Sequence, residues 1–323
     1  MSGRILAQKR SRIRIDYFCN RNWLFCERER RRWTSKSNAT TVDTRETKKF
    51  ELDAEKWWFE RLGPFAKLHS MNPVRCSFII DECLEHHKKT SSSSSSALNN
   101  SNSNSNNHHP LKGLRILDVG CGGGLLSEAL NRLGADVVGL DAGNENIEAA
   151  KRRQKESRMT TINDDDNKRE VKYVCDTAED LGEKEPNSFD VVCALEVIEH
   201  VTDARVFTKA LRKLVKDDGL VFISTISKSM RGILGAIVIA ERVAKMVPAG
   251  THDPSKLIHP SELAIVLERA GLKTNAISGF SYNPITQQWK LTNDLGINYI
   301  VSASVGKNDD DLPLAEVDRK KVE

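Results

Sequence analysis

Two carboxylates and an imidazole stand close together in the segment LEVIEHV, which carries Glu196, Glu199 and His200. If a helical turn begins there, positions i, i+3 and i+4 share one face. Such a set could hold a divalent ion: carboxylate oxygens favour Mg²⁺ or Mn²⁺, and the imidazole allows Zn²⁺ or Co²⁺. Two other interpretations stay open, because acidic residues favour helix starts without any metal and because His200 could act as a general base.

A glycine-rich segment, LDVGCGGG, supplies a second kind of chemistry, since glycine lets a ligand approach the backbone at the end of a strand. It contains Asp118, Gly120 and Gly122. The dinucleotide-binding pattern G-x-G-x-x-G fails here, because its last position is Leu125. Asp141 lies 21 residues beyond Gly120, close to the ~20 expected for an acid that binds ribose hydroxyls. The loop and the acid together predict a site for a nucleotide-like cofactor.

Alternating strands and helices must position these residues. From residue 111 onward, short apolar runs alternate with amphipathic, helix-like segments, which is typical of a doubly wound α/β fold with a mostly parallel sheet. Two later apolar runs flank a loop and could pair antiparallel at the sheet edge, giving a seven-stranded sheet. The strands are expected at residues 114–120, 135–141, 171–176, 189–197, 220–226, 273–282 and 297–305. Asp176 then lies at the end of the third strand.

The chain divides into segments of different composition. An N-terminal stretch has apolar residues at helical spacing and predicts a helical cap, in which Trp57 and Trp58 are expected to serve packing. A Ser/Asn-rich stretch cannot bury enough apolar surface to fold and is expected to be a disordered insertion. The expected boundaries are 46–87 for the cap, 88–110 for the insertion, 111–306 for the main domain and 307–323 for a charged C-terminal tail.

Positive charge is concentrated at the N-terminus. Residues 1–45 hold twelve Lys/Arg against four Asp/Glu, so the rest of the chain is net negative and gives no reason to expect nucleic acid as a partner. The basic stretch interleaves Arg with apolar residues, as a mitochondrial transit peptide does. A membrane-surface helix and a plain basic tail are the alternatives. No run in the sequence reaches the ~18–20 consecutive apolar residues of a membrane span.

Family resemblance extends these expectations. The pattern D-x-G-x-G-x-G resembles the first motif of class I S-adenosylmethionine-dependent methyltransferases. Five blocks resemble, in the same order, the ubiquinone-biosynthesis O-methyltransferases, and especially their mitochondrial members: KFELDAEKWWFERLGPFAKLHSMNPVR, LDVGCGGGLLSEAL, LEVIEHV, MVPAGTHD and YNPITQQWKL. The resemblance covers about residues 46–305 apart from the insertion. It implies the Rossmann-like class I methyltransferase fold with an N-terminal helical cap.

The resemblance also implies roles for individual residues. The expected cofactor-binding residues are Arg75, Asp118, Gly120, Gly122, Asp141, Asp176 and Leu195. The expected magnesium ligands are Glu196, Glu199 and His200, of which Glu199 and His200 are also the expected catalytic residues. Leu195 stands where the bacterial pattern often has methionine, and it keeps an apolar contact near the adenine.

The implied activity is O-methylation of polyprenylated catechols, namely 3,4-dihydroxy-5-polyprenylbenzoate and demethylubiquinol, with S-adenosylmethionine as methyl donor. A phenol with a pKa of about 10 is ionised in only about one molecule in a thousand at pH 7. A metal ion chelated by the two hydroxyls would favour the ionised phenol, or His200 could remove the proton as a general base. The alternatives are a non-catalytic scaffold that binds lipid or cofactor, and methylation of another small phenol.

Location and partners follow from the same resemblance. It implies peripheral attachment to the matrix face of the mitochondrial inner membrane, within a multiprotein ubiquinone-synthesis complex. Residues 231–250, inside an insertion at 228–258, form an apolar stretch dotted with cations that could contact the membrane or pack on the sheet. Tyr282, Asn283 and Pro284 could line the substrate entrance or simply form a turn.

Overall fold

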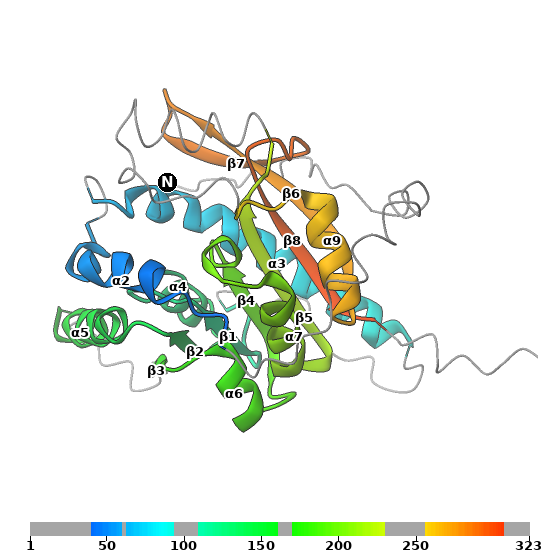
Figure 1. Ribbon diagram of the computed structural model, residues 1–323, viewed down its shortest axis with the longest axis horizontal. Helices are drawn as coiled ribbons and strands as arrows, with labels where there is room; N and C mark the ends of the chain where they lie inside the picture. The colour runs from blue at the N-terminus through cyan, green and yellow to red at the C-terminus, as the bar shows by residue number, and fades with distance from the viewer. Residues whose placement is uncertain (1–39, 60–62, 94–108, 161–169, 230–255, 307–323) are drawn as a thin grey trace, which may run out of the picture.

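Eight strands form one sheet in the computed structural model, which describes residues 40–59, 63–93, 109–160, 170–229 and 256–306. The strands are Arg115–Val119 (β1), Asp136–Asp141 (β2), Lys172–Cys175 (β3), Phe189–Leu195 (β4), Val215–Ile226 (β5), Leu272–Asn283 (β6), Gln288–Thr292 (β7) and Asn298–Val305 (β8). Their order in space is β3-β2-β1-β4-β5-β8-β6-β7 (Figure 1). The first five strands of that order are parallel to one another, whereas β8, β6 and β7 pair antiparallel. We call the edge where β1 to β5 end the carboxyl edge.

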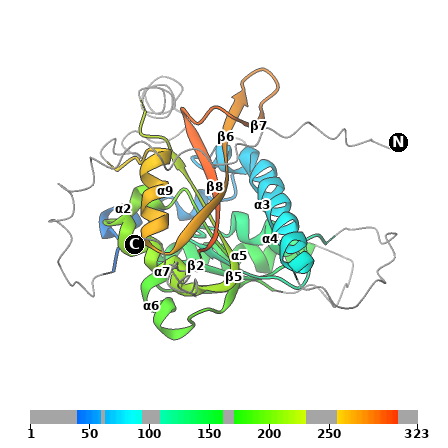
Figure 2. The same cartoon turned by 90° about the vertical axis from the view of Figure 1, so that its right-hand side faces the viewer.

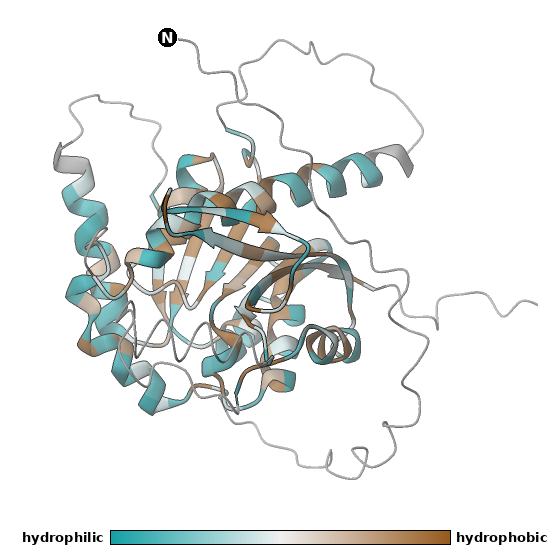
Figure 3. Cartoon of the chain, turned by 90° about the horizontal axis from the view of Figure 1, so that it is seen from above, coloured by the Kyte–Doolittle hydropathy of each residue, from teal (hydrophilic) through white to brown (hydrophobic). Residues whose placement is uncertain are grey.

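Helices cover both faces of the sheet. One face carries Ala66–Ser93 (α3), Leu125–Arg132 (α4) and Asn144–Thr160 (α5), and the other carries Ala178–Lys184 (α6), Ala204–Leu214 (α7) and Pro260–Arg269 (α9). Figure 2 shows α3 and α4 on one side of the strands and α7 and α9 on the other. Successive strand residues alternate between the two cores, as Ile116 and Leu117 of β1 do. The strands in the middle of the molecule carry much of the brown in Figure 3, because both of their faces are buried.

The predicted α/β class is confirmed, but the sheet has one strand more than the seven expected. The two apolar runs do pair antiparallel at the edge, as β6 and β8. The additional strand is β7, which pairs with the end of β6 through Tyr282 and Trp289. Asn283 makes that hairpin, since its Oδ1 accepts from the N–H groups of Ile285 and Thr286 at 2.9 and 3.2 Å.

The N-terminal helical region comprises Thr44–Leu52 (α2), the short 3-10 helix Ala54–Lys56 (η3) and α3. We call α2, η3 and the turn through Trp58 the cap. Helix α3 continues to Ser93, so the insertion expected from residue 88 begins later than predicted. Thr90 lies within this extension, where its hydroxyl donates to the carbonyls of His86 and His87. Residues 94–108 lie outside the described residues.

The segment just before α2 is packed onto the main domain. Thr41 is 2% exposed, and both its N–H and its hydroxyl donate to Oε1 of Glu179. Val42 forms a β-bridge with Val201. The boundary expected at residue 45 is therefore wrong, because the folded region already includes residues 40–45; residues 1–39 lie outside the described residues.

The segment expected to contact a membrane connects β5 to α9 along the sequence. Its two ends are joined by a parallel bridge between Ser227 and Ile258, and Lys228 donates its N–H to the Ile258 carbonyl at 3.2 Å. Residues 230–255 and 307–323 lie outside the described residues. Within the part of the chain that is described, no helix combines the length and apolar character needed to cross a membrane.

Candidate active site

The glycine loop joins β1 to α4 at the carboxyl edge. The N–H groups of Gly120 and Cys121 both donate to the Leu140 carbonyl of β2, at 2.7 and 3.0 Å. Gly122 has a φ of 53°, a left-handed backbone that other residues seldom adopt. Gly120 and Gly122 therefore lie as expected, at the edge where doubly wound sheets bind nucleotides.

Asp141, the last residue of β2, lies beside this loop. Its Oδ2 accepts from the N–H of Gly122 at 2.9 Å, and its Oδ1 accepts from Gly143 N–H at 2.7 Å and from Asn146 Nδ2 at 3.2 Å. Burial raises the pKa of Asp141, and these three donors oppose that shift. The carboxylate is thus fixed against the loop.

Two further expected cofactor residues face different partners. Asp118 is buried and accepts from the Ser127 hydroxyl of α4 at 2.6 Å; burial raises its pKa to about 7. Asp176 follows β3, and its N–H donates to the Asp141 carbonyl at 3.1 Å, while its carboxylate pairs with Lys184 at 2.6 Å. The side chain of Asp118 in β1 therefore faces α4, whereas Asp176 lies next to Asp141.

The chain turns sharply where β4 ends at Leu195. Glu196 has a φ of 58°, and its N–H donates to the Ser224 carbonyl of β5 at 3.0 Å. Its Oε1 accepts from the Ser224 hydroxyl at 2.6 Å and lies 3.2 Å from Nη2 of Arg75. This ion pair brings Arg75 of α3 to the carboxyl edge, so the structure gathers it with the loop residues.

The guanidinium of Arg75 is almost fully buried, with a side-chain exposure of 5%. Within the described residues its Nε has no hydrogen-bond partner, and its Nη2 has the ion pair with Glu196 but no hydrogen bond. A buried cation with unmet donors is costly, and an anionic group beside it would be stabilised by charge-assisted hydrogen bonds. Arg75 therefore fits the role of a contact to an anionic part of the cofactor.

Glu199 lies in a single 3-10 turn, Ile198–His200 (η4), and not in the α-helical turn expected. Its side chain is buried; Oε2 accepts from the Thr225 hydroxyl at 2.9 Å, and Oε1 has no hydrogen-bond partner in the described part of the chain. Burial, and then the charge of Glu196, raise the pKa of Glu199. The two carboxylates are thus near enough to repel each other.

His200 is held from the cap. Its Nδ1 lies 3.1 Å from Oε2 of Glu46 in α2, and Phe50 of the same helix contacts the ring edge-to-face, with centroids 5.0 Å apart. The hydrogen bond to His200 is the largest cause that lowers the pKa of Glu46 to about 2, so this carboxylate is ionised and can only accept. Nδ1 therefore carries the shared proton, and in a neutral ring the lone pair lies on Nε2.

The three expected metal ligands turn toward different partners. Glu196 faces Arg75, Glu199 faces Thr225, and His200 faces Glu46. Among the described residues there is no group of three or more His, Cys, Asp or Glu side chains that could hold an ion. As they lie, Glu196, Glu199 and His200 do not fit a three-ligand metal site, because the 3-10 turn and the left-handed Glu196 replace the single helical face expected.

Sequence reasoning missed what the cap adds to the site. Trp57 and Trp58, expected only to pack, both donate from their indole N–H groups: Trp57 to Oδ1 of Asn146 at 3.0 Å, and Trp58 to the Gly123 carbonyl at 2.9 Å. Glu46 was not singled out either. The available signal was the tryptophan pair itself, because a buried indole N–H usually finds an acceptor.

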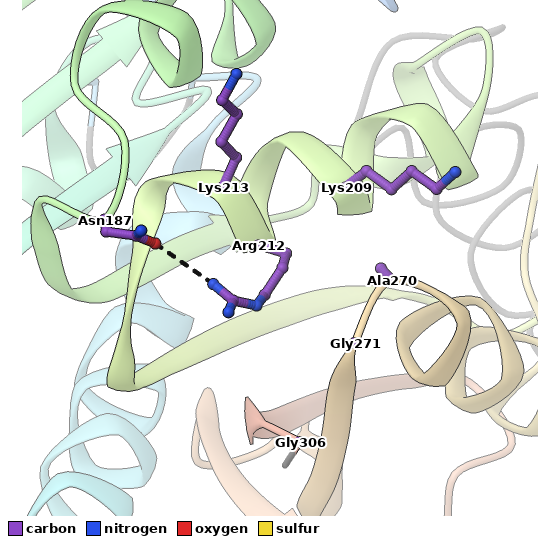
Figure 4. A pocket seen from close by; sticks show the side chains of 7 residues that line it. All are labelled: Asn187, Lys209, Arg212, Lys213, Ala270, Gly271 and Gly306. Carbon is purple, nitrogen blue, oxygen red and sulfur yellow. Dashed lines mark hydrogen bonds between the residues drawn. The ribbon is translucent and has the colours of Figure 1, made fainter. Parts of the chain in front are cut away.

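A separate pocket of about 450 Å³ lies far from these residues (Figure 4). It opens where β5 and β6 begin, which is the end of the sheet opposite the carboxyl edge. Arg212 reaches toward Asn187 there and also pairs with Asp217, and Lys213 pairs with Glu183. None of the expected site residues lines this pocket, which is formed by Asn187, Lys209, Arg212, Lys213, Ala270, Gly271 and Gly306.

Comparison with known proteins shows which families and structures this chain resembles. The family model described as "Methyltransferase domain" matches residues 117–223, which span the loop, Asp141 and the end of β4. The mitochondrial ubiquinone biosynthesis O-methyltransferase of Arabidopsis thaliana is 38% identical over 278 residues, covering 86% of this chain and 79% of the relative. The ubiquinone biosynthesis O-methyltransferase of Rhizobium etli is 38% identical over 264 residues, covering 82% and 96%. Among solved structures, a Thermotoga maritima S-adenosylmethionine-dependent methyltransferase matches 80% of this chain and 98% of its own, at 16% identity and a TM-score of 0.49.

Proposed function

The chain belongs to the family of ubiquinone biosynthesis O-methyltransferases, and from that premise we propose that it transfers a methyl group from S-adenosylmethionine to a hydroxyl of a polyprenylated catechol. The observation that carries the proposal is the grouping at the carboxyl edge. There the Asp141 carboxylate is fixed to the glycine loop, and the buried Arg75 guanidinium, ion-paired with Glu196 through Nη2, has an Nε without a partner among the described residues. Asp141 can accept hydrogen bonds from hydroxyl groups, and Arg75 can donate hydrogen bonds to an anion. An adenosyl amino acid needs both kinds of partner, for its ribose and for its carboxylate.

The residues at this edge divide the work of binding. Asp141 accepts hydrogen bonds from the ribose hydroxyls, and Arg75 binds the carboxylate of the methionine part. Asp176, next to Asp141, and the buried Leu195 border the adenine. When bound, S-adenosylmethionine supplies an electrophilic methyl carbon on its sulfonium sulfur.

His200 acts as the proton acceptor for the substrate hydroxyl. The hydrogen bond to Glu46 keeps the proton of the neutral ring on Nδ1, so Nε2 receives the phenolic proton while the oxygen–carbon bond forms and the carbon–sulfur bond breaks. The ionised Glu46 then stabilises the imidazolium that results. Because the proton leaves while the new bond forms, the reaction avoids a free phenolate. Forming that phenolate from a phenol with a pKa of about 10 would cost ~4 kcal/mol at pH 7.

Magnesium assistance stays a prediction of the family resemblance. The chemistry of two carboxylates and an imidazole suits a divalent ion, but Glu196, Glu199 and His200 as they lie do not form its ligand set. We therefore derive proton transfer from His200 and Glu46 and route no step through a metal.

We also propose a mitochondrial location, supported by the Arabidopsis relative's name and by the basic composition of residues 1–39. Peripheral attachment to the matrix face of the inner membrane, through residues 228–258, and membership of a ubiquinone-synthesis complex are further proposals. They are supported by the prenylated substrates, which partition into a bilayer.

The test uses protein that begins at Thr40, methyl-labelled S-adenosylmethionine and a short-prenyl 3,4-dihydroxybenzoate, with EDTA or with added Mg²⁺. We expect methyl transfer. If EDTA abolishes the transfer and Mg²⁺ restores it, the ion has a role in the reaction. The arrangement of Glu196, Glu199 and His200 described above does not provide that role. Binding of the cofactor without transfer to any prenylated catechol would favour a scaffold or another phenol.

Two variants test the assignment of the base and the magnesium prediction. We expect His200→Ala to lower kcat by about 10²–10⁴-fold and to leave the Kd for S-adenosylhomocysteine nearly unchanged. Glu199→Ala tests the magnesium prediction instead, from which we expect a sharp fall in turnover with cofactor binding largely spared. The matched control is His87→Ala, an exposed histidine on α3, which should change neither value. Unchanged kcat in His200→Ala would exclude it as the base.

A further inference from the structure

Trp57 of the cap lies directly on the glycine loop. Its side chain is 8% exposed, and it stacks on Phe65 with ring centroids 3.6 Å apart. A Cβ added to Gly122 would lie 2.3 Å from Cζ2 of Trp57, and one added to Gly123 would lie 2.4 Å from the Trp57 Cβ. Glycine at these two positions is therefore needed to seat the cap, and not only to admit a ligand.

The indole connects the cap to Asp141 through one buried amide. Trp57 Nε1 donates to Oδ1 of Asn146 at 3.0 Å, and Asn146 Nδ2 donates to Oδ1 of Asp141 at 3.2 Å. Asn146 is only 2% exposed. Its amide orientation is determined by its neighbours, because an indole N–H can only donate and a carboxylate can only accept. The three groups thus form a directed chain of hydrogen bonds.

We propose that Trp57 and Asn146 are positioning residues through which docking of the cap orients the Asp141 carboxylate for the cofactor's ribose. Cofactor affinity then depends on a tryptophan 89 positions away from the amide it holds. The inference rests on the proposed function, since it takes Asp141 as the ribose acceptor. It adds a coupling: the cap and the cofactor stabilise each other, because both need the same orientation of Asp141.

The first experiment measures the Kd of S-adenosylhomocysteine by calorimetry. Trp57→Phe keeps one aromatic ring against Phe65 and removes the N–H together with the rest of the indole, a loss of ring atoms that the control below shares. It should weaken binding about 3–10-fold, the loss expected for one hydrogen bond. Asn146→Leu removes both bonds and should weaken binding more. The KM for S-adenosylmethionine should rise in both variants, while kcat at saturation stays within about twofold.

The control is Trp289→Phe. Trp289 Nε1 donates to the Ser70 hydroxyl at 2.9 Å, an equivalent indole bond between β7 and α3 that does not reach the glycine loop. This variant should leave the Kd unchanged. A double variant, Trp57→Phe with Asn146→Leu, should bind no more weakly than Asn146→Leu alone, because the two residues act through one chain of bonds.

Each outcome separates the inference from the proposed function. No binding by the wild-type protein would contradict the function itself. Normal wild-type binding with an unchanged Kd in Trp57→Phe, or equal weakening in Trp289→Phe, would overturn the inference alone. If a variant folds poorly, hydrogen exchange of the wild type replaces it: S-adenosylhomocysteine should slow exchange of the α2 and η3 amides, and unaltered exchange would overturn the coupling.

Discussion

Two halves of the carboxyl edge are built in different ways. In the loop half, partners are close in sequence: Gly122 and Asp141 are 19 positions apart, Asp118 and Ser127 nine, and Asp141 and Asn146 five. In the half at the end of β4, His200 meets Glu46 across 154 positions, and Glu196 meets Arg75 of α3. The first half is thus assembled within two adjacent βα units, to which the cap adds the bonds from Trp57 and Trp58, whereas the second exists only when the N-terminal helices are docked.

The half at the end of β4, whose partners are distant in sequence, is the distant half. The largest effect should come from removing the ion pair that Arg75 makes there. Arg75→Ala leaves the Glu196 carboxylate, 18% exposed, without its cation, and should lower the free energy of unfolding by about 2–4 kcal/mol. Urea unfolding measures this change. The control is Arg152→Ala, which removes an exposed pair with Glu55 and should cost about 0–1 kcal/mol. Equal costs would mean that burial gives the Arg75 pair no special weight.

A second change tests where the two halves touch. Gly122→Ala combines a left-handed backbone with the contact to Trp57 and should cost about 2–3 kcal/mol. Gly113→Ala is the matched control, since Gly113 has a φ of 90° but nothing within 4 Å of an added Cβ, and it should cost about 1–2 kcal/mol. The difference in unfolding free energy measures the seating of the cap. If both variants lose the same unfolding free energy, Trp57 moves away from the added methyl group at no energetic cost.

The anchor of the cap offers a third test. Protein starting at Glu46 lacks Thr41, with its bonds to Glu179, and the bridge from Val42 to Val201. Relative to protein starting at Thr40, we expect its unfolding free energy to be lower by about 1–3 kcal/mol. Thermal melts of the two proteins check this. Identical melting temperatures would show that α2 docks without the preceding segment.

The smallest effect belongs to the loop half and concerns pH. Burial raises the pKa of Asp118 to about 7, so between about pH 4 and 7 the folded protein retains a proton that the unfolded chain has released. This group therefore lowers stability as pH rises through that window. Asp118→Asn should reduce the loss between pH 5 and 7.5 by about 1–2 kcal/mol in cofactor-free protein. An unaltered pH dependence in urea unfolding would argue against the raised pKa.

The contrast also explains what could be predicted from the sequence. Glycine spacing and the acid at the end of the next strand specify the loop half, because adjacent parallel strands end at one edge. Alternating apolar runs likewise predict the strands and their class. Periodicity alone, however, did not show that Asn283 would form a turn and add β7.

The distant half could not be derived in the same way. Apolar spacing predicts that Phe50 and Trp57 are buried, but it does not say against what. The helical spacing of Glu196, Glu199 and His200 predicts one shared face, whereas the left-handed backbone of Glu196 and a 3-10 turn direct each side chain to a different partner. Such partners depend on tertiary packing, which no local pattern encodes.

The long separation of Glu46 and His200 has a consequence for biosynthesis. The cap emerges from the ribosome before the main domain, and 154 positions separate Glu46 from the histidine it holds. At about 5–20 residues per second, translation takes about 8–30 s to reach that point. For the first part of this interval Trp57, buried in the finished molecule, lacks its own partners, because the glycine loop and Asn146, 89 positions beyond it, have not yet been made. The nascent chain therefore exposes this aromatic surface until the start of α5 has been made, and the grip of Glu46 on His200 forms later still.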